Sequence, residues 1–314
     1  MSRSRPDPDA ILQRLEWTVL RRLDGYLQGN YRSLFRGFGL DLADLREYEL
    51  HDDVRRIDWN VTARMQVPYV REYDEDREIT AWILLDMSPS MEFGSEQMTK
   101  RMMLAEMTAV MARLIIRNGN RVGALFSGGS GLDRVIQARS GRRQVLSIMD
   151  EVLRWPELER APATDLSVFL RDAFHVIRRR SLVILISDFV SAPGWAEPLS
   201  VLAERHEILA VRVFDPLERI LPSMGLMVVQ DAETGDQLLV DTADRRFRKR
   251  FMAAAERYEE TILAALGGAG VDAFELSTTD DLVDCLLRFA DLRKRRSARA
   301  VAGGPERAQR RVVS

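Results

Sequence analysis

The hydrophobic positions of this chain fall into short apolar runs that are separated by longer amphipathic stretches. Residues in the amphipathic stretches repeat with a helical period, for example over 98–118, 142–154 and 165–179. The short apolar runs occupy residues 79–85, 121–126, 182–186, 208–214 and 271–276. Strands that alternate with helices indicate a mostly parallel sheet with helices on both faces. The pattern therefore predicts a doubly wound, Rossmann-like α/β fold.

Further elements complete a predicted sheet domain of residues 79–292. An antiparallel edge strand is expected over 132–137. A hairpin insertion is expected near 226–241, with strands 226–230 and 237–241. Additional helices are expected over 195–204, 244–266 and 280–292.

Both ends of the chain differ from this domain. Residues 1–78 begin with an amphipathic helix over 10–27, continue as an aromatic and charged stretch, and contain a strand at 69–73. We interpret them as an amino-terminal module. Residues 293–314 are rich in arginine, which predicts a disordered basic tail. Such a tail is either a solvated end or an electrostatic contact for a membrane surface, nucleic acid or an acidic partner.

Composition narrows the functional classes. The formal net charge of −2 argues against nucleic-acid binding by the main body. The single cysteine, Cys285, excludes an internal disulfide framework, fits a reducing compartment and is expected to pack in the core. The three histidines lack zinc-ligand spacing. No run reaches the roughly 18 to 20 apolar residues of a membrane span, and the first residues are polar. We therefore expect a cytoplasmic protein without a transmembrane segment.

Five oxygen-bearing side chains are predicted to meet at one edge of the sheet. Asp86, Ser88 and Ser90 form an Asp-x-Ser-x-Ser sequence directly after the first strand of the sheet domain. Thr164 precedes a later helix, and Asp188 follows a later strand. Parallel strands place their carboxyl ends at the same edge, so the three loops can converge. Hydroxyl and carboxylate oxygens suit a hard cation, which favours Mg²⁺ or Mn²⁺ over zinc.

The same residues also have a purely structural interpretation. Serine, proline and aspartate are common in turns, and Asp86 alone would serve as a cap for the segment that follows it. The supply of similar ligands from three separate loops is what favours a metal site. The prediction depends on Thr164 and Asp188 lying close to the Ser88 hydroxyl.

The order of these five residues resembles the metal-ion-dependent adhesion site of von Willebrand factor A-type domains. Upstream, the chain resembles the bacterial domain-of-unknown-function-58 (DUF58) family, whose members carry such a domain. It departs from that family at His51, where glycine is expected, and at Thr62, where serine is usual. The resemblance spans roughly residues 32–191 and is carried by RGFG at 36–39, LREY at 45–48, DDVRRIDW at 52–59 and AR at 63–64.

The resemblance implies a metal-dependent protein–protein interaction module and not an enzyme. In the adhesion sites, a partner's carboxylate completes the coordination of the ion, here Mg²⁺, Mn²⁺ or Ca²⁺. The implied partner is a MoxR-type AAA+ ATPase, with roles in chaperone-like assembly or cell-envelope processes. By analogy, the closing helix over 280–292 is a candidate coupling element.

The alternative is a metal-dependent phosphoryl-transfer hydrolase that resembles the haloacid-dehalogenase kind, which also has a carboxylate after its first strand. Such enzymes carry a second aspartate two residues later as a general acid. This chain has Ser88 there, and a serine hydroxyl is a poor proton donor near neutral pH. A nucleotide-binding P-loop sequence is absent.

A charged cluster in the amino-terminal module also has two interpretations, a partner-recognition surface or an ion-pair network that fastens the module to the sheet. We favour the ion-pair network. The cluster consists of Asp52, Asp53, Arg55, Arg56, Asp58 and Arg64.

Overall fold

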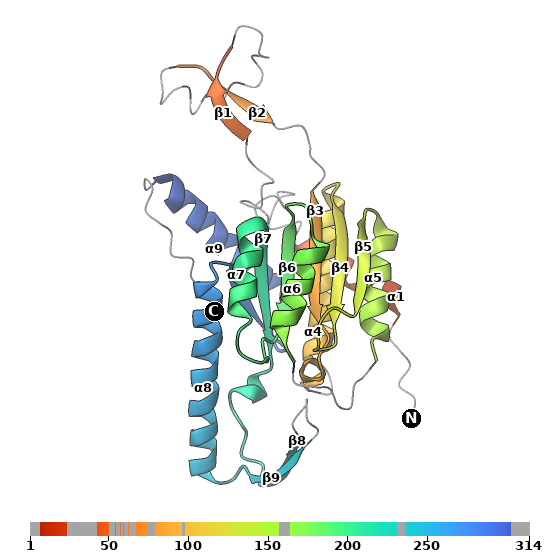
Figure 1. The fold of residues 1–314 in the computed structure, drawn as a ribbon, viewed down its shortest axis with the longest axis vertical. Helices are drawn as coiled ribbons and strands as arrows, with labels where there is room; N and C mark the ends of the chain where they lie inside the picture. Colours follow the sequence, from red (N-terminus) through yellow and green to blue (C-terminus); the bar gives the residue numbers. More distant parts are fainter. Residues whose placement is uncertain are drawn as a thin grey trace.

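The computed structural model describes residues 7–23, 43–49, 67–73, 79–95, 98–156, 164–230 and 236–302, together with four separate residues between 54 and 62. Its main feature is a six-stranded sheet in the order β10-β7-β6-β3-β4-β5 (Figure 1). All neighbouring strands run parallel except β5, which pairs antiparallel with β4 at one edge. This arrangement confirms the predicted mostly parallel α/β sheet and its antiparallel edge strand.

The strands are apolar along their length because helices cover both faces of the sheet. Central strand β3 sends Ile83 and Leu85 to one face and Trp82 and Leu84 to the other, and each set joins a separate core cluster. The strand bounds are β3 Thr80–Asp86, β4 Arg121–Ser127, β5 Arg134–Arg139, β6 Leu182–Ser187, β7 Glu207–Phe214 and β10 Asp272–Ser277.

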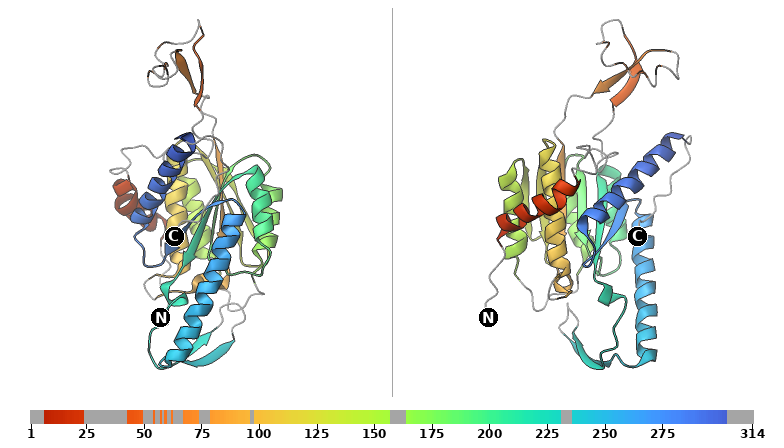
Figure 2. Two further views of the ribbon diagram at one scale, coloured as in Figure 1. Left: turned by 90° about the vertical axis from the view of Figure 1, so that its left-hand side faces the viewer. Right: turned by 180° about the vertical axis from the view of Figure 1, so that it is seen from behind.

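Helices from distant parts of the chain form the two outer layers (Figure 2). One face is covered by α1 (Pro8–Leu15), α4 (Lys100–Arg117), α5 (Arg142–Arg154) and α9 (Leu282–Ala302). The opposite face is covered by α6 (Leu166–Val176), α7 (Ala196–Arg205) and α8 (Arg245–Gly268). In α4 the methionine-rich surface is mainly core, as Met103, Met107 and Met111 are buried. No helix in the described part of the chain is long and apolar enough to cross a membrane.

The start of the predicted amino-terminal module shares the core of the sheet. Helix α1 continues as a π-helical segment, η1 (Glu16–Leu20), and Leu12 and Leu15 join the same cluster as β3. Farther on, the predicted strand β2 (Tyr69–Tyr73) pairs antiparallel with β1 (Ala43–Glu47), which was not predicted because its sequence is charged. The charged cluster of residues 52–64 lies outside the described residues.

Helix α9 is longer than predicted. It continues through the first ten residues of the stretch that we predicted to be a disordered tail, and reaches Ala302. Residues 293–302 are mostly arginine, alanine and lysine, which are good helix formers, and the first helix breakers are Gly303, Gly304 and Pro305. The prediction that disorder begins at residue 293 is therefore corrected, whereas residues 303–314 lie outside the described part of the chain.

His206 supplies a pH-dependent part of the stability. Its side chain is buried where α7 ends and β7 begins. Burial, together with the charge of Arg205, lowers the pKa of His206 from 6.5 to about 4. In the unfolded chain the His206 side chain takes up a proton near pH 6.5, whereas in the folded protein it does so only near pH 4. The contribution of His206 to the free energy of unfolding is therefore fully present above pH 6.5 and is lost as the pH drops toward 4. We expect a loss on the order of 2 kcal/mol over this range.

Urea unfolding followed at a series of pH values measures this loss. His206→Gln is expected to flatten the pH dependence between neutral pH and pH 4, because glutamine does not titrate. The exposed His175 provides a matched control, and His175→Gln is expected to keep the wild-type pH dependence. An unchanged slope in His206→Gln would contradict the assignment.

Candidate metal-binding site

The candidate site lies where the direction of the chain across the sheet reverses. From β3 the chain moves outward to β4 and β5, and then returns to form β6 on the other side of β3. The loops that leave β3 and β6 therefore diverge, and such switch points form crevices at the carboxyl edge of a sheet. Asp86 is the last residue of β3, and Asp188 directly follows β6.

Asp86 is fully buried and fixed by hydrogen bonds from both sides. Its Oδ1 accepts the Ser88 backbone N–H at 3.0 Å, and its Oδ2 accepts the Ser187 hydroxyl at 2.6 Å. A short 3₁₀ turn, η4 (Pro89–Glu92), then folds the chain so that the Ser88 and Ser90 hydroxyl oxygens lie 3.1 Å apart. Local turn geometry therefore gathers one carboxylate and two hydroxyls.

Gly129 lets the third loop approach the first. Its φ is +121°, and a Cβ at this position would lie 3.2 Å from Thr164 Oγ1 and 3.8 Å from Ser88 Cβ. A side chain there would fill the space between the two residues. Asp165, next to Thr164, caps α6 by accepting the Ser167 backbone N–H at 2.9 Å, so its role is structural.

Asp188 completes the predicted set and is paired with a buried lysine. Its Oδ1 accepts the Val190 backbone N–H at 2.9 Å, and its Oδ2 accepts Lys100 Nζ at 2.6 Å. Lys100 is fully buried at the first position of α4, and it also donates to Glu218 Oε1 at 2.5 Å. Sequence reasoning named the five oxygen-bearing side chains and missed Lys100.

The electrostatics of the site favour additional positive charge. Burial and the charge of Asp188 raise the pKa of Asp86 to about 6, although hydrogen bonds from Ser187 and Ser88 act in the opposite direction. Burial alone would lower the pKa of Lys100, but Asp188 and Glu218 outweigh it and raise that pKa. Lys100 thus pairs with Asp188 and Glu218, and the charge of Asp188 also acts on the buried Asp86 carboxyl group.

The donor set fits a hard cation. All five predicted side chains are buried at the same edge, and three of them are neutral hydroxyls. Within the described residues, no group of three or more His, Cys, Asp or Glu side chains is placed to hold a metal ion. A cation here would therefore depend on Ser88, Ser90 and Thr164, which are ligands suited to Mg²⁺ and unsuited to zinc.

The same geometry offers little to a phosphoryl-transfer reaction. The Ser88 hydroxyl, at the position of the hydrolase general acid, is hydrogen-bonded to Ser90. Lys100 is held by Asp188 and Glu218, so its charge is already balanced and is not presented to a phosphate.

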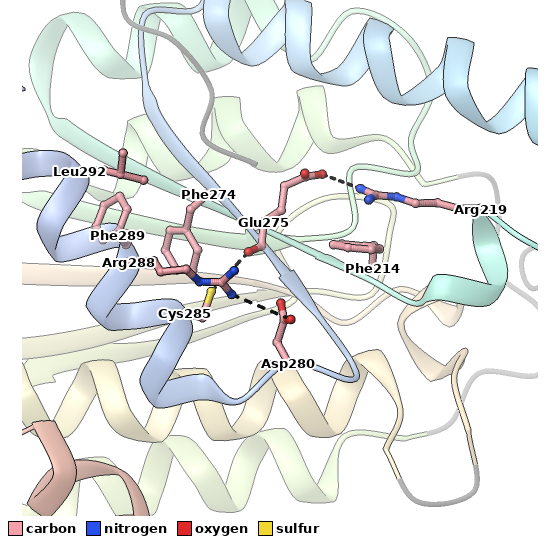
Figure 3. Close-up of a pocket in the computed structure, with 9 residues that line it drawn as sticks. All are labelled: Phe214, Arg219, Phe274, Glu275, Asp280, Cys285, Arg288, Phe289 and Leu292. Carbon is pink, nitrogen blue, oxygen red and sulfur yellow. Dashed lines mark hydrogen bonds and ion pairs between the residues drawn. The ribbon is translucent and has the colours of Figure 1, made fainter.

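A cavity lies between α9 and β10, the strand at one edge of the sheet (Figure 3). It has a volume of about 200 Å³. Its charges face one another, since Arg219 donates to Glu275 at 2.8 Å and Arg288 lies 4.0 Å from Asp280. Burial raises the pKa of Cys285 to about 11, so the thiol stays protonated at neutral pH. The buried position predicted for Cys285 is confirmed. Because these charged side chains face one another and the thiol is protonated, the cavity does not indicate a particular class of ligand.

Comparison with known proteins gives matches across most of the chain. The family model described as "Protein of unknown function DUF58" matches residues 44–261, which include all five predicted ligand positions. The uncharacterized protein Rv1480 of Mycobacterium tuberculosis is 36% identical over 292 residues, covering 92% of this chain and 91% of that protein. The uncharacterized protein MAV169 of Mycobacterium avium is 32% identical over 160 residues, covering 51% and 94%.

Two solved structures illustrate the structural similarity. An aerotolerance-related membrane protein from Bacteroides fragilis is similar with a TM-score of 0.46 and 11% identity, over 69% of this chain and 99% of that one. A von Willebrand factor type A structure from Catenulispora acidiphila is similar with a TM-score of 0.38 and 11% identity, over 72% of this chain and 43% of that one.

Proposed function

Because the chain belongs to the DUF58 family, we propose that it is a protein-interaction module whose binding depends on a divalent metal ion. The observation that carries this proposal is the convergence of five buried oxygen-bearing side chains from three loops at the switch point of the sheet. Each loop taken alone is an ordinary turn, and it is the combination of the three loops that supports a metal-binding site.

The ligand types define how the module would bind a partner. Ser88, Ser90 and Thr164 contribute neutral oxygens, and only Asp86 and Asp188 carry charge. A divalent cation with few carboxylate ligands stays electron-poor and offers a position to an acidic side chain from another protein. Lys100, which is itself paired with Glu218, keeps Asp188 in place. The module itself then needs no catalytic residue.

The proposed partner is a MoxR-type AAA+ ATPase that supplies the acidic side chain, in chaperone-like assembly or cell-envelope processes. The support for this partner is the resemblance of the chain to its family. The support for an acidic contact is the hydroxyl-rich composition of the site.

Metal binding is the first test. Ser88→Ala combined with Ser90→Ala is expected to weaken Mn²⁺ and Mg²⁺ binding by more than about tenfold, because two neutral ligands are lost. Isothermal titration calorimetry measures the affinity. Ser95→Ala, an exposed serine a few residues farther along the chain, is the matched control and is expected to bind as the wild type does. Equal affinities in all three proteins would remove these hydroxyls from the site.

Partner binding is the second part of the same test. Pull-down of a MoxR-type AAA+ ATPase is expected to succeed with Mg²⁺ and to fail with EDTA or in Asp86→Asn. Retention of the ATPase under both conditions would show that the metal does not take part in the interaction.

A further inference from the structure

The β8–β9 hairpin exposes apolar side chains that a folded domain normally buries. Strands β8 (Leu226–Gln230) and β9 (Gln237–Asp241) pair only with each other among the described strands. Leu226 and Val228 are 71% and 56% exposed, and Leu239, opposite Val228 on the same face, is 64% exposed. On the other face Val240 is buried, but Leu238 is also 64% exposed. The first face is therefore open along its length.

This apolar surface continues toward the candidate metal-binding site. The hairpin follows the carboxyl end of β7, and Figure 1 shows it beyond the lower end of the sheet. The connecting segment exposes Leu217, Ile220 and Met224. It includes the short 3₁₀ turn η5 (Pro216–Glu218), whose Glu218 accepts Lys100 Nζ at 2.5 Å. Because Lys100 also holds Asp188, the hairpin and the metal-binding site border the same edge.

The first turns of α8 add a basic surface at the base of the hairpin. Five of the six residues from 245 to 250 are arginine or lysine, and four of these five side chains are exposed. Arg248 instead folds back onto the Thr242 and Ala243 carbonyl oxygens. Cations at a helix amino terminus oppose the helix dipole, so the cluster does not serve the stability of α8. Its charge is suited to an acidic binding partner.

We propose that the β8–β9 hairpin and the basic start of α8 form a docking surface for an extended, acidic and apolar segment of the partner protein. Such a segment adds a strand to an open hairpin edge, places alternate apolar side chains on the exposed face, and pairs its acidic side chains with α8. The proposal rests on the proposed function in that the same partner reaches the metal.

Charge argues for a protein over the other occupants. A lipid layer that took up the apolar hairpin would also have to bury the carboxylates of Asp231, Glu233 and Asp236, which lie between the two strands in the sequence. A strand that pairs with the hairpin edge does not have to bury these carboxylates. In a symmetric pair of chains the same basic cluster is present on both copies and supplies no acidic complement by itself.

The test uses the full chain and a fluorescein-labelled peptide in which valine and glutamate alternate, with a valine–lysine peptide for comparison. Fluorescence anisotropy is expected to show binding of the acidic peptide and at least about tenfold weaker binding of the basic one. Val228→Thr combined with Leu239→Thr is expected to weaken acidic-peptide binding at least about tenfold. Arg245→Gln combined with Arg246→Gln is expected to weaken it and to reduce its salt dependence.

Matched controls change equivalent residues elsewhere. Val201→Thr alters an exposed valine on α7, and Arg179→Gln combined with Arg180→Gln alters exposed arginines before β6. Both controls are expected to bind the acidic peptide as the wild type does. Wild-type affinity in the Val228/Leu239 variant, or preference for the basic peptide, would overturn the proposal.

Two further measurements separate this proposal from its competitors and from the metal. Sedimentation with anionic vesicles, or dimerisation in analytical ultracentrifugation, that is abolished by the Val228/Leu239 changes would assign the surface to lipid or to a second copy instead. The Val228/Leu239 variant is expected to keep wild-type Mg²⁺ affinity. Peptide binding that is weakened by the Val228/Leu239 changes but unaffected by EDTA would support the docking surface and refute the proposed metal dependence. Peptide binding that is lost in EDTA but unaffected by the Val228/Leu239 changes would refute the docking surface alone.

Discussion

Lys100→Met is expected to lower the free energy of unfolding by about 3–5 kcal/mol, because it leaves a buried carboxylate without its counter-ion. The Lys100 and Asp188 side chains are almost completely inaccessible to solvent, at 0% and 1%. Lys100 Nζ lies 2.6 Å from Asp188 and 2.5 Å from Glu218. Methionine keeps the length and apolar stem of the lysine but removes the charge and both hydrogen bonds.

Chemical denaturation of both proteins measures the effect. Lys249→Met, at an exposed position of α8, is the matched control and is expected to change the free energy of unfolding by no more than about 0.5 kcal/mol. The double variant Lys100→Met with Asp188→Asn is expected to recover part of the loss, since the unpaired charge is gone. A single variant as stable as the wild type would show that the buried pair contributes nothing net.

Many of the strands and helices could be predicted from the sequence because burial determines the spacing of apolar residues along each element. The strands of the parallel sheet are apolar on both faces, so 182–186 and 208–214 stand out from their surroundings. The hairpin strands were bounded correctly at 226–230 and 237–241 by the turn residues between them. Strand β1 was missed because its sequence, ADLRE, carries no such pattern. The end of α9 was missed because its basic composition also suits a disordered tail.

Sequence reasoning selected the oxygen-bearing side chains of the candidate site but not the charged residues around them. The rule that parallel strands share a carboxyl edge brought Asp86 and Asp188 together without knowledge of the crossovers. Thr164 and Ser88 both border the space that a Cβ at Gly129 would occupy, and no signal in the sequence indicated this role of Gly129. Whether the set binds a metal stays a prediction.

Lys100 had one signal that sequence reasoning did not use. The chain contains three lysines and is otherwise basic through arginine, so a lysine at the start of an apolar helix is unusual for this sequence. The compact ammonium group of Lys100 donates to two carboxylates, and lysine and arginine are not interchangeable at such a buried position. Pairing with Asp188 and Glu218, which are 88 and 118 residues away, depends on tertiary contacts that local pattern does not contain.

Gly123, in the core, is a second residue whose role depends on tertiary contacts that the local sequence pattern does not contain. Glycine in a strand interior indicates a close approach, but only the structure shows that the neighbour is the Trp82 ring on β3. A Cβ at position 123 would lie 2.7 Å from Trp82 Cζ3 and 3.0 Å from the Ala138 backbone nitrogen of β5. The pairing of β4 with β5 also shifts register at this point. The glycine therefore accommodates a buried indole between two strands.

Gly123→Ala is expected to lower the free energy of unfolding by about 2–3 kcal/mol, because the added methyl group overlaps a ring and a strand backbone that are both fixed. Trp82→Leu in the same chain is expected to return part of that loss by removing the clashing ring atoms, as measured by urea unfolding. Gly268→Ala is the matched control, because the added Cβ meets no atom within 4 Å beyond the chain neighbours and the backbone of its own helix. Alanine also favours the helix, so the effect is expected to be neutral or stabilising. Equal effects of the two alanine substitutions would mean that backbone entropy, and not the Trp82 contact, determines the requirement for glycine at position 123.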